Sequence, residues 1–289
     1  MKNLSRIVLV DKPAGISSFG VVARVRRQLS EEAGQRVKVG HTGTLDPFAT
    51  GLMVLLSGKF TRRAGEFSKL DKVYEATIHL GATSTTGDPE GEINTYPELF
   101  SLARSADFRV EKSFSKIQNQ ISTSSSNLDF NQKDFSGKSE RSQRKNNSVE
   151  PFVLQAPTQQ EIKQVLQKFT GKITQTPPIY SAIKVDGERA YKLARAGKTP
   201  KIPPRQVEIY SLELLEYTYP KLKIRAHVSS GTYIRTLAED IGKELKTGAY
   251  TAELRRIKIG EYDIKMAEKL PNGVEPLSNS KKPAKLSPI

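Results

Sequence analysis

The stretch KLKIRAHVSSGTYIRTLAEDIGKEL, from Lys221 to Leu245, changes its periodicity halfway along. In the first half, apolar residues alternate with basic ones, which is typical of a strand with one buried face. Those apolar residues are Leu222, Ile224, Ala226 and Val228. In the second half the apolar residues lie three or four positions apart, at Ile234, Leu237, Ile241 and Leu245. The stretch therefore predicts a strand with a basic outer face, followed directly by an amphipathic helix.

Two more helices are indicated by their capping signals. Ser17 or Ser18 can cap a helix with one apolar face, which comprises Val21, Val22, Val25 and Leu29. Thr158 and Glu161 form a capping box before a helix that Gly171 is expected to end.

Strand signals lie between and after these helices. Residues 73–82 alternate, with Tyr74 on the apolar face, and Asp186-Gly187 is a turn signal after a short strand. Strands interleaved with helices in this way predict an α+β fold, in which a mixed, mostly antiparallel sheet is flanked by helices.

The texture of the chain changes twice. Residues 98–155 are rich in Ser, Asn and Gln and poor in large aliphatic side chains, which is typical of a disordered segment. Residues 265–289 carry lysines and prolines and suggest a basic flexible tail. We therefore expect one discontinuous catalytic domain, formed by residues 1–97 and 156–264, with residues 98–155 as a disordered insertion.

The net charge of +15 and the pI of about 9.8 make a polyanion the expected partner. The chain has no cysteine, which excludes disulfides, thiolate nucleophiles and Cys-based metal sites and is compatible with the cytoplasm. The apolar runs are too short to span a bilayer. The three histidines share no ligand spacing, and no glycine pattern supports a dinucleotide, so we expect neither a metal nor a cofactor.

The segment GHTGTLDPFATG, from Gly40 to Gly51, allows two interpretations. Asp46-Pro47 by itself is a good N-cap and first helical position, and it favours a helix running through Leu52 and Leu55. The alternative is a functional loop, since three glycines and a histidine surround the carboxylate of Asp46.

Two other segments carry candidate residues. Tyr233 and Arg235 lie where the strand of the opening stretch passes into its helix. A cation there opposes the helix dipole, so Arg235 suggests a carboxylate or phosphate partner. The segment from Thr176 to Tyr191 offers Tyr180 and Lys184 as possible substrate contacts, although by itself it indicates only a strand that ends in a hairpin.

Together these segments resemble the tRNA pseudouridine-55 synthase family of the TruB type. The matching blocks follow the family's order and cover most of the chain outside the insertion: LVDKPAGISS (9–18), GHTGTLDPFATG (40–51), KVYEATIHLGATSTTGD (72–88), QTPPIYSAIKVDG (175–187), GTYIRTLAEDIG (231–242) and AELRRIKIG (252–260). The resemblance implies the pseudouridine synthase fold, a uridine in the T-arm of tRNA as substrate, and base flipping.

The resemblance also implies roles for single residues. Asp46 matches the catalytic aspartate, Arg235 the arginine that pairs with it, and Tyr74 the catalytic tyrosine that stacks on the target uracil and helps to remove a proton. Substrate contacts are implied at the remaining matched positions, which are His41, Tyr233, Leu254 and Lys12. His41 is expected to enter the RNA loop, and Lys12 with Pro13 to brace the site. An arginine beside the aspartate should lower its pKa and keep it ionised.

The chain departs from the family in two places, at the insertion and at the C-terminus. A C-terminal RNA-binding domain of the PUA type is expected to be absent. We expect an enzyme that acts as a monomer, without a membrane or a protein partner. Two alternatives stay open: a guide-RNA-dependent synthase of the H/ACA type, which the missing domain disfavours, and a non-catalytic RNA-binding protein, which the intact set of site residues disfavours.

Overall fold

The computed structural model describes residues 5–95 and 156–270. The helices are α1 (Ser18–Ala33), α2 (Ala64–Ser68), α5 (Gln159–Lys168), α6 (Ala190–Arg195) and α7 (Ile234–Glu244), with short 3-10 helices η1 (Gly58–Arg63) and η4 (Ile264–Met266). The strands are β1 (Ile7–Lys12), β2 (Val39–His41), β3 (Thr50–Ser57), β4 (Lys72–Leu80), β5 (Ala82–Ser84), β6 (Ile93–Thr95), β7 (Gly171–Gln175), β8 (Lys184–Val185), β9 (Glu188–Arg189), β10 (Arg205–Thr218), β11 (Lys221–Val228), β12 (Ala249–Ile259), β13 (Tyr262–Asp263) and β14 (Glu268–Lys269).

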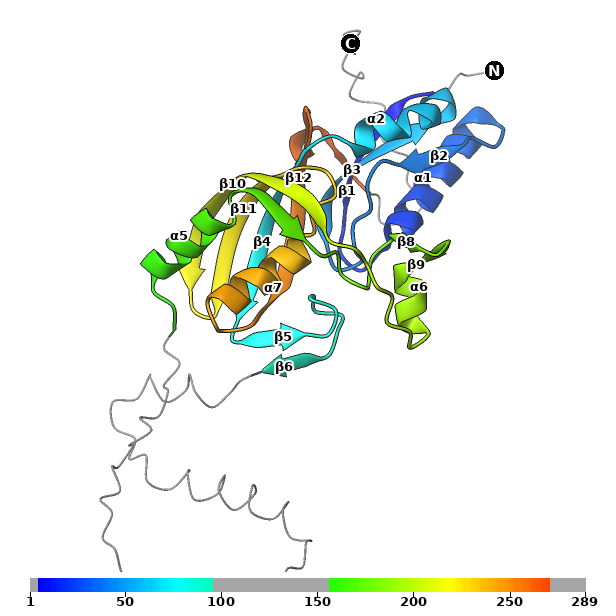
Figure 1. The fold of residues 1–289 in the computed structure, drawn as a ribbon. Coiled ribbons are helices and arrows are strands. Elements are labelled where there is room, and N and C mark those ends of the chain that lie inside the picture. Colours follow the sequence, from blue (N-terminus) through cyan, green and yellow to red (C-terminus); the bar gives the residue numbers. More distant parts are fainter. Residues whose placement is uncertain (1–4, 96–155, 271–289) are drawn as a thin grey trace, which may run out of the picture. The chain divides into compact units, whose positions relative to one another are not determined.

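Ten of the strands form one sheet, which joins segments from both sides of the undescribed residues 96–155 (Figure 1). Its order is β14-β1-β3-β12-β4-β11-β10-β7, with β2 beside β3 and β13 beside β12. The pairs β1–β14 and β3–β12 are parallel and the other pairs are antiparallel. The predicted mixed, mostly antiparallel sheet is confirmed.

Helices α1, α5 and α7 bury their apolar faces in one core cluster together with one face of the sheet. Strand β4 shows the reason, since its alternating side chains Tyr74, Ala76, Ile78 and Leu80 all belong to that cluster. In Figure 1, α7 lies in front of the central strands and α5 lies beside β10, toward one edge of the sheet. A second, smaller cluster joins Leu52 and Val54 of β3 to Phe67 of α2. Because β3 contributes to both clusters, it is buried on both faces.

The predicted local signals are largely confirmed. Ser17 caps α1 by accepting a hydrogen bond from the backbone of Gly20, and both halves of the capping box of Thr158 and Glu161 are present at α5. The hairpin β8–β9 turns at the predicted position. Helix α5 ends at Lys168 with its C-cap at Phe169, so Gly171 begins β7 and does not cap the helix.

Of the two interpretations of the segment around Asp46, the one with a helix after Asp46-Pro47 is wrong, since residues 50–57 form strand β3. This run, TGLMVLLS, is almost continuously apolar and therefore fits a central strand that is buried on both faces. Gly51, with φ of 106°, permits the close approach of β3 to the backbone of Arg256 in β12. The cap-like residues thus mark a loop before a strand.

The folded part extends beyond the predicted start of the tail at residue 265. Strand β14 pairs in parallel with β1, and Leu270 is buried in the main core. The start of the tail was predicted from composition alone. Strand β14 could not be recognised in this way, because its two residues are too few to show an alternating pattern. The proposed insertion at 98–155 and the rest of the tail lie outside the described residues. No helix of the described part is long and apolar enough to cross a membrane.

Candidate active site

The loop that carries Asp46 connects β2 to β3 and is fixed to its surroundings by backbone and side-chain hydrogen bonds. The hydroxyl of Ser18, in the first turn of α1, donates to the carbonyl of Leu45 and accepts from its amide, both at 2.8 Å. The amide of Thr42 donates to the carbonyl of Val54 at 3.1 Å. Helix α1 and strand β3 therefore hold the loop from two sides.

Two buried cations hold the same loop through its carbonyl oxygens. The ammonium group of Lys12 donates to the carbonyls of Pro47 at 3.0 Å and Ala49 at 2.5 Å. Arg256, at 1% exposure, donates from Nε to Leu52 at 2.8 Å and from its terminal nitrogens to Gly43 and Thr44 at 3.2 and 3.4 Å. Burial lowers the pKa of Lys12 to about 8, although the charge of Asp46 opposes this shift. Carbonyls on both sides of Asp46 are thus bound by positive groups.

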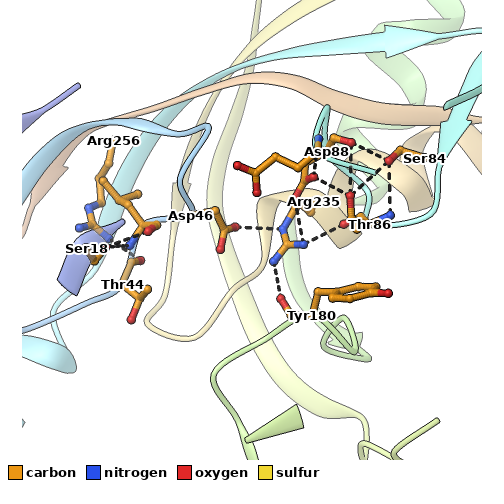
Figure 2. A network of polar contacts seen from close by, with 11 residues as sticks. Ser18, Thr44, Asp46, Ser84, Thr86, Asp88, Tyr180, Arg235 and Arg256 are labelled. Atoms are coloured by element: carbon orange, nitrogen blue, oxygen red, sulfur yellow. Dashed lines mark hydrogen bonds and ion pairs between the residues drawn. The ribbon is translucent and has the colours of Figure 1, made fainter. Parts of the chain in front are cut away.

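Arg235 reaches the loop from the opposite side of the cleft, from the first turn of α7. Its Nε lies 3.0 Å from a carboxylate oxygen of Asp46, and one terminal nitrogen lies 3.1 Å from a carboxylate oxygen of Asp88. Figure 2 shows these contacts, with Asp46 pointing toward the guanidinium group. The remaining donors reach the carbonyls of Thr86 at 2.7 Å and Tyr180 at 2.8 Å. The guanidinium group is therefore fixed in one orientation.

Asp46 and its partners differ in exposure. The side chains of Arg235 and Asp88 are each 4% exposed, whereas that of Asp46 is 34% exposed. The buried groups Arg235 and Asp88 therefore fix the orientation of Asp46, whose carboxylate remains accessible from the cleft. A fixed carboxylate that a ligand can reach is suited to act as a nucleophile or a base.

The pKa of Asp46 is raised above its usual value of 3.8, and the largest cause is burial. Arg235 and Lys12 act in the opposite direction, while the charge of Asp88 adds to the rise. The sequence predicted that the arginine would lower this pKa. Arg235 does lower the pKa of Asp46, as predicted. Burial of the carboxyl group raises this pKa by more, so the net shift is upward.

A cleft of about 780 Å³ opens in front of this ion pair. Five of the predicted site residues line it together: Asp46, Tyr74, Tyr233, Arg235 and Leu254. They come from the β2–β3 loop, β4, the connection between β11 and α7, the start of α7, and β12. The cleft combines a charged pair with aromatic and aliphatic walls, which suits a flat polar ring such as a nucleobase.

Three other predicted residues lie outside the lining of the cleft. Lys12 contacts the loop from behind, as the predicted brace requires. His41 lies in β2, where burial is the first cause that lowers its pKa and its Nδ1 has no hydrogen-bond partner in the described part of the chain. Lys184 is exposed in the β8–β9 hairpin. Ser181 and Ala182 of the same segment line the cleft, whereas Lys184 does not.

Sequence reasoning missed three buried polar residues of the site. Asp88 is the second partner of Arg235, and Arg256 holds the loop. The side-chain amide of Gln175, at 1% exposure, pairs with the backbone amide and carbonyl of Tyr233 at 2.8 and 3.0 Å. Asp88 and Arg256 lie within matching blocks, but their partners are distant in sequence. Among the described residues, no three His, Cys, Asp or Glu side chains are arranged to hold a metal ion.

Comparisons with known proteins find relatives that match most of the chain. A family model described as TruB family pseudouridylate synthase (N terminal domain) matches residues 26–137 and 134–234. A model of the tRNA pseudouridylate synthase B C-terminal domain matches residues 235–272. The chain is 35% identical to tRNA pseudouridine synthase B of Phocaeicola vulgatus over 260 residues, which are 89% of this chain and 87% of the relative.

Longer relatives and solved structures show the same likeness. Identity to tRNA pseudouridine synthase B of Stutzerimonas stutzeri is also 35%, over 91% of this chain and 66% of that protein. The crystal structure of a Cbf5-Nop10-Gar1 complex contains a chain with a TM-score of 0.53 and 24% identity, covering 91% of this chain and 52% of that one. This structural likeness concerns the fold.

Proposed function

The chain belongs to the TruB family of pseudouridylate synthases, and we propose that it converts uridine 55 in the T-arm of tRNA to pseudouridine with Asp46 as the nucleophile. A pseudouridylate synthase is an isomerase, because its product contains the same atoms as its substrate. The observation that carries the proposal is the contact of 3.0 Å between Asp46 and Arg235, formed across the cleft by segments far apart in the sequence. The tRNA substrate is inferred from the relatives and from the net charge of +15.

The reaction breaks the bond from ribose C1′ to N1 of uracil and forms a bond from C1′ to C5. The proton on C5 leaves and N1 gains one, so that atoms and electrons balance without a redox partner. The carboxylate of Asp46 attacks either C1′ or C6 of the nucleotide. For either attack it must be ionised, and the orientation imposed by Arg235 leaves its exposed face toward the cleft.

A uridine inside a folded RNA loop has to leave its stack before Asp46 can reach it. In the proposed complex the ring of Tyr74 stacks on the flipped uracil, and Leu254 and Tyr233 form the other walls of its pocket. Tyr74 also assists the removal of the C5 proton, which passes to water. His41 fills the space that the base vacates, and its lowered pKa keeps it neutral for that contact.

The fixed positions of these groups are part of the proposed catalysis. Because Arg235 and the loop are held by hydrogen bonds before substrate arrives, little reorganisation is required when charge develops on the nucleotide. We further propose that residues 98–155 are an insertion into this single catalytic domain. A monomer in the cytoplasm, without a cofactor or protein partner, completes the proposal.

The test is an assay of the purified chain on an unmodified tRNA transcript, without any guide RNA, in which pseudouridine is mapped by position. One pseudouridine at position 55 is expected, and the isolated T-arm hairpin should also react. A transcript with cytidine at position 55 is the matched control and should remain unmodified. Product at another position would contradict the assigned uridine, product that requires an added guide RNA would favour the guide-dependent alternative, and binding without product would favour a non-catalytic protein.

A further inference from the structure

The outward face of α1 differs from its buried face in a way that the reaction does not explain. Val21, Val25 and Leu29 lie in the core, whereas Phe19, in the first turn, is 69% exposed. Among the described residues, Phe19 is the most exposed large apolar side chain. A single exposed phenylalanine can be incidental. Its place on the helix gives it significance, because a cluster of arginines follows it along the same face.

An open groove of about 370 Å³ follows along this face of the helix. Six residues line it: Ala23, Arg24, Arg26, Arg27, Ser30 and Arg36. Ala23, Arg26 and Arg27 lie four, seven and eight positions after Phe19, and Ser30 lies three positions after Arg27. These spacings place them on one surface of the helix. We call this set, without Phe19, the arginine groove.

Arg36 belongs to the groove because the chain turns back at the end of α1. Gly34 adopts the left-handed conformation, with φ of 65°, and closes the helix. Ser30 then holds the returning chain, since its carbonyl accepts from Gln35 at 3.2 Å and its hydroxyl accepts from Val37 at 3.0 Å. The position of Arg36 is thus built into the fold.

The charge of the groove is poorly neutralised. Arg27 lies 4.0 Å from Glu31, and both side chains are about 60% exposed, so this pair is weak. Glu32, the other acid of α1, is 3.0 Å from Arg6. Arg24, Arg26 and Arg36 have no acidic partner within 4.0 Å among residues 5–95 and 156–270. Several guanidinium groups around one hollow are suited to phosphate oxygens.

The groove lies on the same rigid element that fixes the nucleophile loop. Ser18, at the start of α1, makes the two hydrogen bonds with Leu45 described above. With a rise of about 1.5 Å per residue, Arg24 and Arg27 lie roughly 9 and 14 Å further along the helix axis. Successive phosphates of an RNA strand are several ångströms apart, so a strand entering the cleft can reach the groove within a few nucleotides.

We propose that the outward face of α1 is a second RNA-binding surface, on which the arginine groove binds backbone phosphates and Phe19 stacks on an unpaired base. This proposal rests on the proposed function, since the RNA is the substrate whose reactive nucleotide occupies the cleft. Exposed aromatic rings beside basic side chains are a common means of binding single-stranded or looped RNA. The surface raises affinity without taking part in the chemical step.

The test compares two double variants with the same change in charge. Arg24→Glu/Arg27→Glu alters the groove, and Lys163→Glu/Lys172→Glu, at exposed positions of α5 and β7, is the matched control. Dissociation constants are measured by filter binding with the transcript that carries cytidine at position 55, which cannot react. The groove variant should raise Kd about tenfold or more, and the control less than about threefold. The slope of log Kd against log salt should become shallower by about 1.4 to 1.8, as expected for two lost phosphate contacts.

Two further variants separate the parts of the surface. Phe19→Ala should raise Kd about threefold to tenfold with an unchanged salt slope, because stacking releases no counterions. Arg24→Lys/Arg27→Lys keeps the charge and should bind within about threefold of the wild type. Far-ultraviolet circular dichroism and melting curves establish that each variant is folded, which their exposed positions favour.

Equal changes in Kd for the groove and control variants would overturn the proposal. So would binding to phosphatidylserine vesicles that depends on Arg24 and Arg27 while RNA affinity is unchanged, because the groove would then serve a lipid surface. The binding assay does not depend on turnover. A wild-type protein that makes no pseudouridine would therefore contradict the proposed function, and the comparison of the variants would still decide whether this face binds RNA.

Discussion

Three buried cations hold the segments that form the two sides of the candidate site, and the cations of the two sides have different partners. On the loop side, Lys12 and Arg256 bind backbone carbonyls. On the helix side, Arg235 binds two carboxylates as well as two carbonyls. Carbonyls carry no net charge, so the first pair mainly fixes the shape of the loop. Arg235 contacts the nucleophile itself, so its replacement should affect the chemical step directly.

The largest contrast is expected from Arg235→Lys. Lysine keeps the positive charge but loses the planar fork, so it cannot hold Asp46, Asp88 and two carbonyls together. We expect kcat to fall by about 100-fold, with a smaller change in KM. Steady-state kinetics on full-length tRNA measure both. Equal activity of the lysine and arginine forms would contradict the role assigned to the ion pair.

Arg256→Met should reduce stability more than catalysis, in contrast to Arg235→Lys. It leaves the carbonyls of Gly43, Thr44 and Leu52 without this donor, and it replaces a guanidinium group that is almost completely buried where β12 pairs with β3. The free energy of unfolding should fall by about 3 kcal/mol, as measured in urea. At a temperature where the variant stays folded, kcat should fall less than in Arg235→Lys. A normal stability with a larger loss of kcat would show that Arg256 acts in the reaction.

The pairing of Arg235 with Asp46 was predicted from the resemblance to the TruB family. The residues alone indicated only that an arginine in the first turn of a helix has a carboxylate or phosphate partner. The strand β11, the helix α7 and the caps of α1 and α5 also follow from local periodicity and capping signals. These features depend on neighbours within a few residues, which is why a single sequence contains them.

The pH dependence of the reaction provides a finer test of the helix side. Burial raises the pKa of Asp46 above 3.8, and Asp88 contributes to the rise. Because the nucleophile must be ionised, kcat/KM should increase with pH through this raised pKa and then level off. Asp88→Asn removes a negative neighbour, so the acid limb of its profile should move to lower pH. An acid limb that stays in place or moves upward would contradict the assigned coupling.

What the sequence could not predict depends on contacts between distant segments. Local signals after Asp46 favoured a helix, and only the burial of β3 on both faces decides for a strand. Asp88 and Arg256 could be seen as charged residues, but their roles depend on partners up to 213 positions away. The net direction of the pKa shift of Asp46 likewise depends on how much solvent the fold removes.

The smallest effect is expected from the proposed insertion. Replacing residues 103–147 by a short Gly/Ser linker should change the free energy of unfolding by about 1 kcal/mol or less, because the cost of loop closure changes slowly with length. Strands β4 and β7, from the described segments before and after it, belong to one sheet. Activity on a saturating T-arm substrate should persist. A melting temperature many degrees lower, or a folded but inactive protein, would show that the segment contributes to the core or the site.

The central claim is that Asp46 is the nucleophile, and Asp46→Asn under single-turnover conditions tests it most directly. Asparagine keeps the size of the side chain but cannot attack carbon, so no pseudouridine should form above background. Stability should not fall near neutral pH. The pKa of Asp46 is higher in the folded state than in the unfolded state. Its carboxyl group therefore stabilises the fold fully at a pH below the unfolded-state pKa, and this contribution is lost as pH rises through the folded-state pKa. A folded Asn variant that retained a few per cent of the wild-type rate would contradict the claim.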